Sequence, residues 1–113
     1  MTFEEIKFSD KNAVALKLGA SLLGGTEAMD FSKKIAELCS NQTSNIFIDL
    51  GDVEAMNSSG LGMLVSAFTT IKKHNLNMAL VDTPQKVTSL LELTQLDKIF
   101  SFENDLQSAI SKI

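Results

Sequence analysis

Arginine, tryptophan and tyrosine are absent from this chain of 113 residues, and cysteine, proline and histidine each occur once. The 10 basic residues are therefore all lysines, and they face 14 acidic residues, which gives a net charge of −4. Arginine forks are the usual means of holding a phosphate and of reading base edges in DNA. Without arginine, and with an acidic balance, we expect no direct binding of nucleic acid.

Long apolar runs and a leader-like N-terminus are also missing. No apolar run approaches the ~18–20 residues that a membrane helix needs, so we expect no membrane insertion. The first residues lack a basic segment followed by an apolar one, and Cys39 has no cysteine partner within the chain, which suits a reducing compartment. With 44% hydrophobic and 21% charged residues, the chain is predicted to be one cytoplasmic globular domain over residues 1–113.

Hydrophobic periodicity predicts an α/β fold with one mixed β-sheet. Alternating patterns over residues 3–8 and 13–18 indicate two strands of a hairpin, and the apolar runs 46–50 and 78–81 are typical of strands covered on both faces. Apolar residues at helical spacing predict four helices, which begin after Thr26, cover residues 61–71, begin at Pro84 and begin after Ser101. Thr83 is the expected cap of the third helix, with Pro84 at its first position. A short edge strand is expected at 99–100. We therefore expect a sheet of four to five strands covered by about four helices.

The loop from Gly51 to Gly62 leads from a buried strand into the central predicted helix. In open α/β sheets, functional groups gather at the carboxyl ends of the strands, which is where this loop begins. Asn57, Ser58 and Ser59 are all good helix N-caps, and capping alone is one interpretation of them. The other is a phosphate on Ser58 or Ser59. A helix N-terminus favours an anion by about 0.3–1 kcal/mol, so such a group would change the surface without unfolding the domain.

The chain resembles the STAS domain, and more narrowly the bacterial anti-sigma-factor antagonists, which are single STAS domains of this size. Three segments carry the resemblance, and the Gly19-x-x-Leu22 loop extends it over nearly the whole chain. They are Phe47-Ile-Asp-Leu50, Met56-Asn-Ser-Ser-Gly-Leu-Gly62 and Leu90-Leu-Glu-Leu-Thr-Gln-Leu-Asp-Lys-Ile-Phe100.

The resemblance implies a phosphorylation switch that controls the choice of partner. In that family the unphosphorylated domain binds an anti-sigma factor, a serine kinase of the histidine-kinase-like ATPase fold, and thereby frees a sigma factor. The kinase then phosphorylates the first serine of the loop, which ejects the antagonist, and a PP2C-type phosphatase restores it. By position the modified serine is Ser58. The implied partner-binding residues are Asn57, Ser58, Ser59, Gly60, Leu61, Gly24 and Gly25.

Asn57 departs from the family pattern, which has an acidic residue immediately before the modified serine. Asparagine keeps a carbonyl acceptor and caps helices well, so the loop geometry need not change. It removes a negative charge beside the acceptor, which bears on recognition by the kinase. The alternative function is therefore a STAS subunit with a structural or regulatory role in a lipid-transport or stress-signalling assembly, without a working phosphosite.

Enzymatic readings of the same residues fail on spacing. His74 is the only histidine, and it lies ~24 Å along the predicted helix from Ser58, too far to act as its base. Asp49, Asp52 and Glu54 have no second acidic pair at the same sheet edge to form a receiver site, so we expect them to be loop and cap groups. No ligand spacing for a metal is visible. We expect no enzyme, no cofactor and no metal.

Two further residue types have an ambiguous role. Cys39 lies on the apolar stripe of its helix, which favours a buried structural thiol. Met29, Met56 and Met63 are either core residues or part of a contact surface. A small ligand bound in a loop pocket is a third possible function, supported only by the sheet edge itself.

Overall fold

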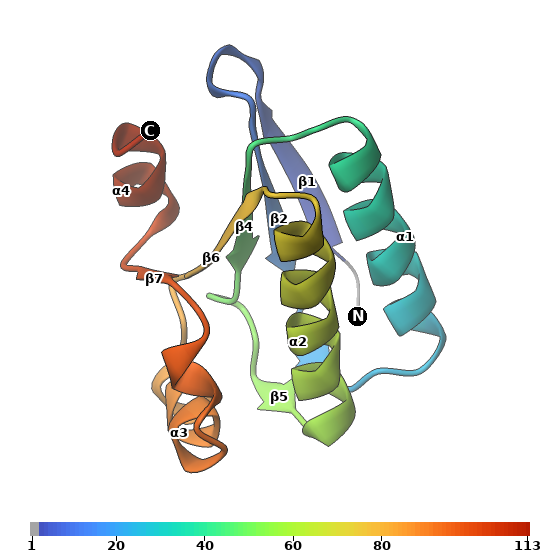
Figure 1. Ribbon diagram of the computed structural model, residues 1–113. Coiled ribbons are helices and arrows are strands. Elements are labelled where there is room, and N and C mark those ends of the chain that lie inside the picture. Colours follow the sequence, from blue (N-terminus) through green and yellow to red (C-terminus); the bar gives the residue numbers. More distant parts are fainter. Residues whose placement is uncertain (1–2) are drawn as a thin grey trace.

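The computed structural model describes residues 3–113 and has a five-stranded sheet at its centre (Figure 1). The strand order is β1-β2-β4-β6-β7, with β1 antiparallel to β2 and the other pairs parallel. The strands are β1 (Phe3–Phe8), β2 (Ala13–Leu18), β4 (Asn45–Asp49), β6 (Asn77–Val81) and β7 (Phe102–Glu103). The parallel strands end at one edge of the sheet, at the bottom of Figure 1, where the serine loop lies.

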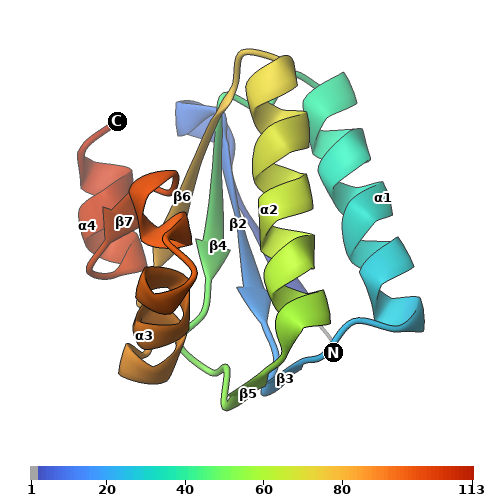
Figure 2. The same ribbon diagram turned by 60° about the horizontal axis from the view of Figure 1, so that its bottom comes forward.

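Two helices, α1 (Thr26–Ser40) and α2 (Ser58–Lys73), lie side by side over one face of the sheet (Figure 2). The buried residues of this face belong to one continuous core, because alternate residues of the strands point toward the helices. Leu16, Ile48 and Leu80 of three adjacent strands have no exposed surface, and Leu64 of α2 packs with them. The core therefore holds α2 in a defined position relative to the strand ends.

An ion-pair cluster ties α1 to the edge strand β1. Lys34 Nζ lies 3.0 Å from Glu5 Oε1 and 3.1 Å from Glu37 Oε2. The hydrogen bonds with Glu5 and Glu37 raise the pKa of Lys34 above its ordinary value. The pair joins residues far apart in sequence and helps to fix the helix on the sheet.

The opposite face of the sheet is covered by the short helix α4 (Leu106–Ser111). Ala13 and Ala15 of β2 and Phe47 of β4 form a second buried cluster with Ala109. Asp105 caps α4, because its Oδ1 accepts a hydrogen bond from the Ser108 amide at 2.7 Å, and this bond lowers the pKa of Asp105. Small side chains on both sides allow the short helix to approach the sheet closely.

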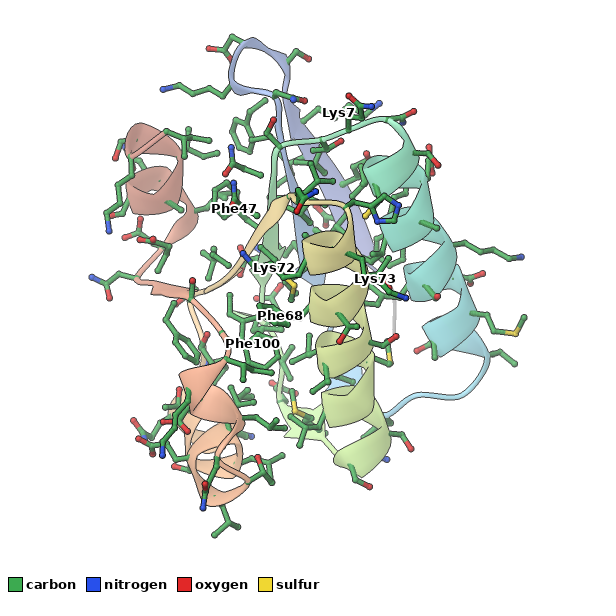
Figure 3. The ribbon with its side chains drawn as sticks, in the orientation of Figure 1. Lys7, Phe47, Phe68, Lys72, Lys73 and Phe100 are labelled. Carbon is green, nitrogen blue, oxygen red and sulfur yellow. The ribbon has the colours of Figure 1, made fainter. Side chains whose placement is uncertain are left out.

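The helix α3 (Gln85–Leu93) extends the first core beyond β6, through the buried residues Val87 and Leu91. Phe68 of α2 meets Phe100 edge-to-face, with ring centroids 5.5 Å apart, and Figure 3 shows the two residues next to each other. Lys72 Nζ lies 5.9 Å from the centre of the Phe68 ring. The segment after α3 is therefore packed against the helix that carries the serine loop.

The predicted α/β class is confirmed, with five strands in the main sheet and four α-helices within residues 3–113. Three local predictions are wrong. Gly25, not Thr26, is the N-cap of α1, and Pro84, not Thr83, is the N-cap of α3. The last edge strand is β7, because Phe100 is needed in the core and the pairing with β6 begins only at Phe102. None of the helices in residues 3–113 combines the length and apolar character that spanning a membrane requires.

Candidate functional site

The two loops that the sequence assigned to a partner surface are joined by a small second sheet. The strand β3 (Ser21–Leu22) pairs in parallel with β5 (Ala55–Met56), directly before α2. The amides of Glu54 and Ala55 both donate to the Ala20 carbonyl, at 2.7 and 3.0 Å. The glycine loop (residues 19–25) and the serine loop (residues 51–62) therefore form one surface at the sheet edge.

Asn57 is the N-cap of α2, and it is one of the three capping candidates that the sequence offered. Its side-chain Oδ1 accepts a hydrogen bond from the Gly60 amide at 2.9 Å, and its carbonyl accepts one from the Leu61 amide at 2.9 Å. The backbone of Asn57 is extended, with φ −122° and ψ −174°, which is the conformation typical of an N-cap. The side-chain oxygen of Asn57 thus accepts the capping hydrogen bond that an aspartate oxygen would accept at the same position.

Ser58 and Ser59 are the first two residues of α2, and both are exposed. Their surroundings differ, however. Ser59 lies against the glycine loop, since a Cβ placed on Gly24 would come within 2.7 Å of Ser59 Cβ. Gly24 also has φ +86°, a conformation that side chains rarely adopt, so glycine is required there twice over. Ser59 is thus in contact with the neighbouring loop.

Gly60 and Leu61 fix the serine loop on the side that faces β3 and the core. A Cβ on Gly60 would lie 1.9 Å from the Leu22 carbonyl oxygen, so the helix can approach β3 only with glycine at this position. Leu61 is 8% exposed and packs in the main core. Gly25 is exposed, with φ +79°, at the start of α1. The predicted partner residues thus comprise four exposed residues, the half-buried Gly24, and two buried residues that position them.

Two lysines hold the outer part of the serine loop. Lys86 of α3 donates a hydrogen bond to the Glu54 carbonyl, and Lys17 Nζ lies 3.7 Å from Asp52 Oδ2. Asp49 Oδ1 accepts a hydrogen bond from the Gly51 amide at 2.9 Å, so this residue stabilises the turn as predicted. Sequence reasoning missed Lys86, because no local pattern links residue 86 to a loop thirty positions earlier.

Gly62 lies one turn into α2 and, unlike Gly60, has open space around it. Apart from the neighbouring residues and backbone of its own helix, no atom lies within 4 Å of a Cβ placed there. Because glycine is less stable than alanine inside a helix, Gly62→Ala should raise the free energy of unfolding by about 0.5–1 kcal/mol. Urea denaturation at neutral pH measures this shift. A decrease in the free energy of unfolding would show that the added methyl group meets other atoms in solution.

The rival sites do not assemble in the described part of the chain. His74 caps the far end of α2, where its Nδ1 is 2.9 Å from the Thr70 carbonyl oxygen. Cys39 is 2% exposed, and burial raises the pKa of its thiol, which disfavours the reactive thiolate. No group of three or more metal-ligating side chains occurs within residues 3–113. The serine loop is thus the candidate site that these residues support best.

The three methionines singled out by the sequence differ in burial, and Met56 is partly buried against the core. Met63 is 8% exposed and belongs to the core, whereas Met29, near the start of α1, is 61% exposed. Leu23 in the glycine loop is also exposed, by 47%. Sequence reasoning did not single out Leu23, since an apolar residue in a short loop is normally expected to pack inward.

Comparison with known proteins gives a consistent result. The STAS domain family model matches residues 6–109. A Thermotoga maritima protein provisionally named an anti-sigma factor antagonist is 33% identical over 70 residues, which are 62% of this chain and 62% of that protein. The aligned part thus spans less than two thirds of that relative's length.

Solved structures are similar over almost the whole chain. The crystal structure of a Thermotoga maritima protein, also provisionally named an anti-sigma factor antagonist, has a TM-score of 0.82 at 27% identity and covers 98% of this chain and 93% of its own. Bacillus SpoIIAA has a TM-score of 0.76 in its phosphorylated form and 0.79 in its unphosphorylated form, where it is called an anti-sigma factor antagonist. These two comparisons, at 14% and 15% identity, each cover 98% of this chain and 98% and 95% of the SpoIIAA chain, and they show the shared fold.

Proposed function

The chain belongs to the STAS domain family, and we propose that it acts there as an anti-sigma-factor antagonist controlled by phosphorylation of Ser58. The observation that carries this proposal is the position of Ser58, which is exposed at the first position of α2 directly after the capping residue Asn57. The unphosphorylated chain binds an anti-sigma factor that is also its serine kinase, and so releases a sigma factor. A PP2C-type phosphatase reverses the modification.

The choice of Ser58 over Ser59 follows its position in the family resemblance, and the surroundings of Ser59 agree with it. Ser59 Cβ lies against Gly24, so a phosphate on Ser59 would sit beside the glycine loop. A phosphate on Ser58 would add about −1.5 to −2 charges at a helix N-terminus, where backbone amides and the helix dipole favour an anion. The domain then remains folded in both states, and the added charge acts on the partner.

We infer that the chain is a substrate and a ligand of other proteins and not a catalyst. Activation of a serine needs a base within hydrogen-bond reach. His74 lies at the opposite end of α2, a helix of 16 residues and hence about 24 Å long. Ser58 therefore lacks an imidazole neighbour and fits the role of phosphate acceptor.

The test is phosphorylation of the purified chain by purified anti-sigma-factor kinases of its source organism, with intact mass as the readout. We expect one phosphate-sized increase in mass for the native chain and none for Ser58→Ala, which should still bind the kinase. Ser59→Ala is the matched control and should remain a substrate. A phosphate mapped by peptide sequencing to another residue would overturn the assignment of Ser58.

The alternative function, a STAS subunit without a phosphosite, is tested at Asn57. Asn57→Asp restores an acidic residue beside Ser58 and retains an oxygen that can cap α2. If only this variant is phosphorylated, the native loop is a binding surface without a switch. A pull-down that returns an ATPase–permease complex, and no kinase, would then favour the transport or stress-signalling assembly.

A further inference from the structure

A groove of about 300 Å3 runs between α1 and α2 on the outer side of the two helices, which lie side by side in Figure 2. Small residues of both helices form its rim, and buried apolar residues form its floor. The rim includes Ala28, Ser32, Gly62 and Ser66, and the floor includes Phe31 and Met63. The groove therefore has an apolar floor and a rim of small side chains.

Gly62 is the residue whose presence the packing of this chain does not explain. Glycine is one of the least favourable residues inside a helix, and it is tolerated where another group must come close. Gly60 has such a reason, because the Leu22 carbonyl occupies the place of its Cβ. Gly62 faces the groove with no atom within 4 Å of that place. The free space at Gly62 is available to a group from another molecule.

Two exposed apolar side chains belong to the segments next to the groove and to the serine loop. Met29, one residue after the groove residue Ala28, is 61% exposed, and Leu23, next to Gly24, is 47% exposed. Gly24 in turn lies against Ser59, so the loop that carries Leu23 adjoins the serine loop. Methionine adapts its shape to a partner, and exposed apolar residues that cluster usually mark an interaction surface.

The two loops alone are too small to form a stable protein–protein interface. A stable complex buries about 800 Å2 on each partner, from roughly 20–30 residues a side. The predicted partner residues of the two loops are few, and Gly60 and Leu61 are already buried in the chain itself. A partner seated on Ser58 must therefore cover adjoining surface, and the apolar, hollow part of that surface is the α1–α2 groove.

We propose that the anti-sigma factor inserts an apolar side chain into the groove at Gly62 and packs against Met29 and Leu23 at its edge. The proposal rests on the proposed function, since it gives the same partner a second contact area. Phosphorylation of Ser58 then acts on one end of an interface whose other end supplies apolar affinity. The groove explains how a small, charged loop can hold a partner tightly in its unmodified state.

The experiment is titration calorimetry of the unphosphorylated chain with the anti-sigma factor that phosphorylates it. Gly62→Leu fills the groove and should weaken binding about tenfold or more, without lowering the melting temperature. Met29→Ala removes an exposed side chain and should weaken binding about fivefold. Leu93→Ala is the control, because Leu93 is 82% exposed on α3, on the side of α2 away from α1 (Figure 1).

The outcomes separate this proposal from the function on which it rests. If the native chain binds and both groove variants bind equally well, the groove proposal is wrong and the serine-loop function stands. If the native chain is neither bound nor phosphorylated, both fail together. A native dimer that Gly62→Leu abolishes, with partner binding unchanged, would assign the groove to a second copy and overturn the proposal. So would a co-purified apolar small molecule that only Gly62→Leu loses.

Discussion

The Ser58→Asp protein should fold normally and bind the anti-sigma factor about 100-fold more weakly than the native chain, or worse. A carboxylate at the first position of α2 is favoured by the helix N-terminus, by about 0.3–1 kcal/mol, so stability should not fall. In the complex the same charge loses its water and gains no opposite charge. Stranding a charge in this way costs several kcal/mol, and about 2.8 kcal/mol corresponds to two factors of ten in affinity.

The matched control is Ser58→Asn, which has nearly the shape of aspartate and no charge. It should bind within a few-fold of the native chain if charge, and not size, is what the partner rejects. Calorimetric titration gives both affinities, and urea denaturation shows that both variants are folded. Equal and strong binding by the two variants would contradict a switch based on charge at Ser58. Equal and weak binding would show that the partner rejects the size of the side chain.

The Gly60→Ala protein should lose about 3 kcal/mol of stability or more, out of the roughly 5–15 kcal/mol typical of a domain. The added methyl carbon would lie 1.9 Å from the Leu22 carbonyl oxygen and 2.8 Å from its carbon, and both are backbone atoms. Relief requires the start of α2 to move away from β3. That movement breaks the packing that holds the two loops together. The midpoint of urea unfolding, at an unchanged slope, measures the loss.

Gly62→Ala is the matched control for this prediction, since it adds the same methyl group to the same helix two residues later. The two substitutions should change stability in opposite directions, because one position is filled by backbone and the other faces open space. Equal changes at Gly60 and Gly62 would mean that helix propensity alone decides both. The close approach of α2 to β3 would then have no energetic consequence.

The serine loop was identifiable from the sequence because its signals are local. Asn57 belongs to a residue type that often caps helices. A loop with capping residues and glycines directly after a buried strand marks the functional edge of an α/β sheet. The structure places Asn57 as the cap of α2, with its Oδ1 on the Gly60 amide. The contact of Ser59 with Gly24 was not readable from the sequence, because the fold brings Gly24 against Ser59 from the other loop.

The misplaced caps and the misplaced edge strand have a common cause. Thr26 and Thr83 are good capping residues, but the turns before them place Gly25 and Pro84 at the boundaries of α1 and α3. Phe100 looks like a strand residue, yet it is 7% exposed in the core against Phe68, and β7 forms only after it. Propensity is a weak preference, and tertiary packing overrides it at element ends.

The sequence by itself determined the fold class and the helix that starts at the serine loop. These follow from periodicity, capping and composition, which act over a few residues. Only the tertiary structure decided that β3 joins the glycine loop to β5, that Gly60 has no room and Gly62 has open space, and that Met29 is exposed. Such features depend on which segments distant in sequence come into contact and how closely they pack, and local sequence patterns do not encode these distances.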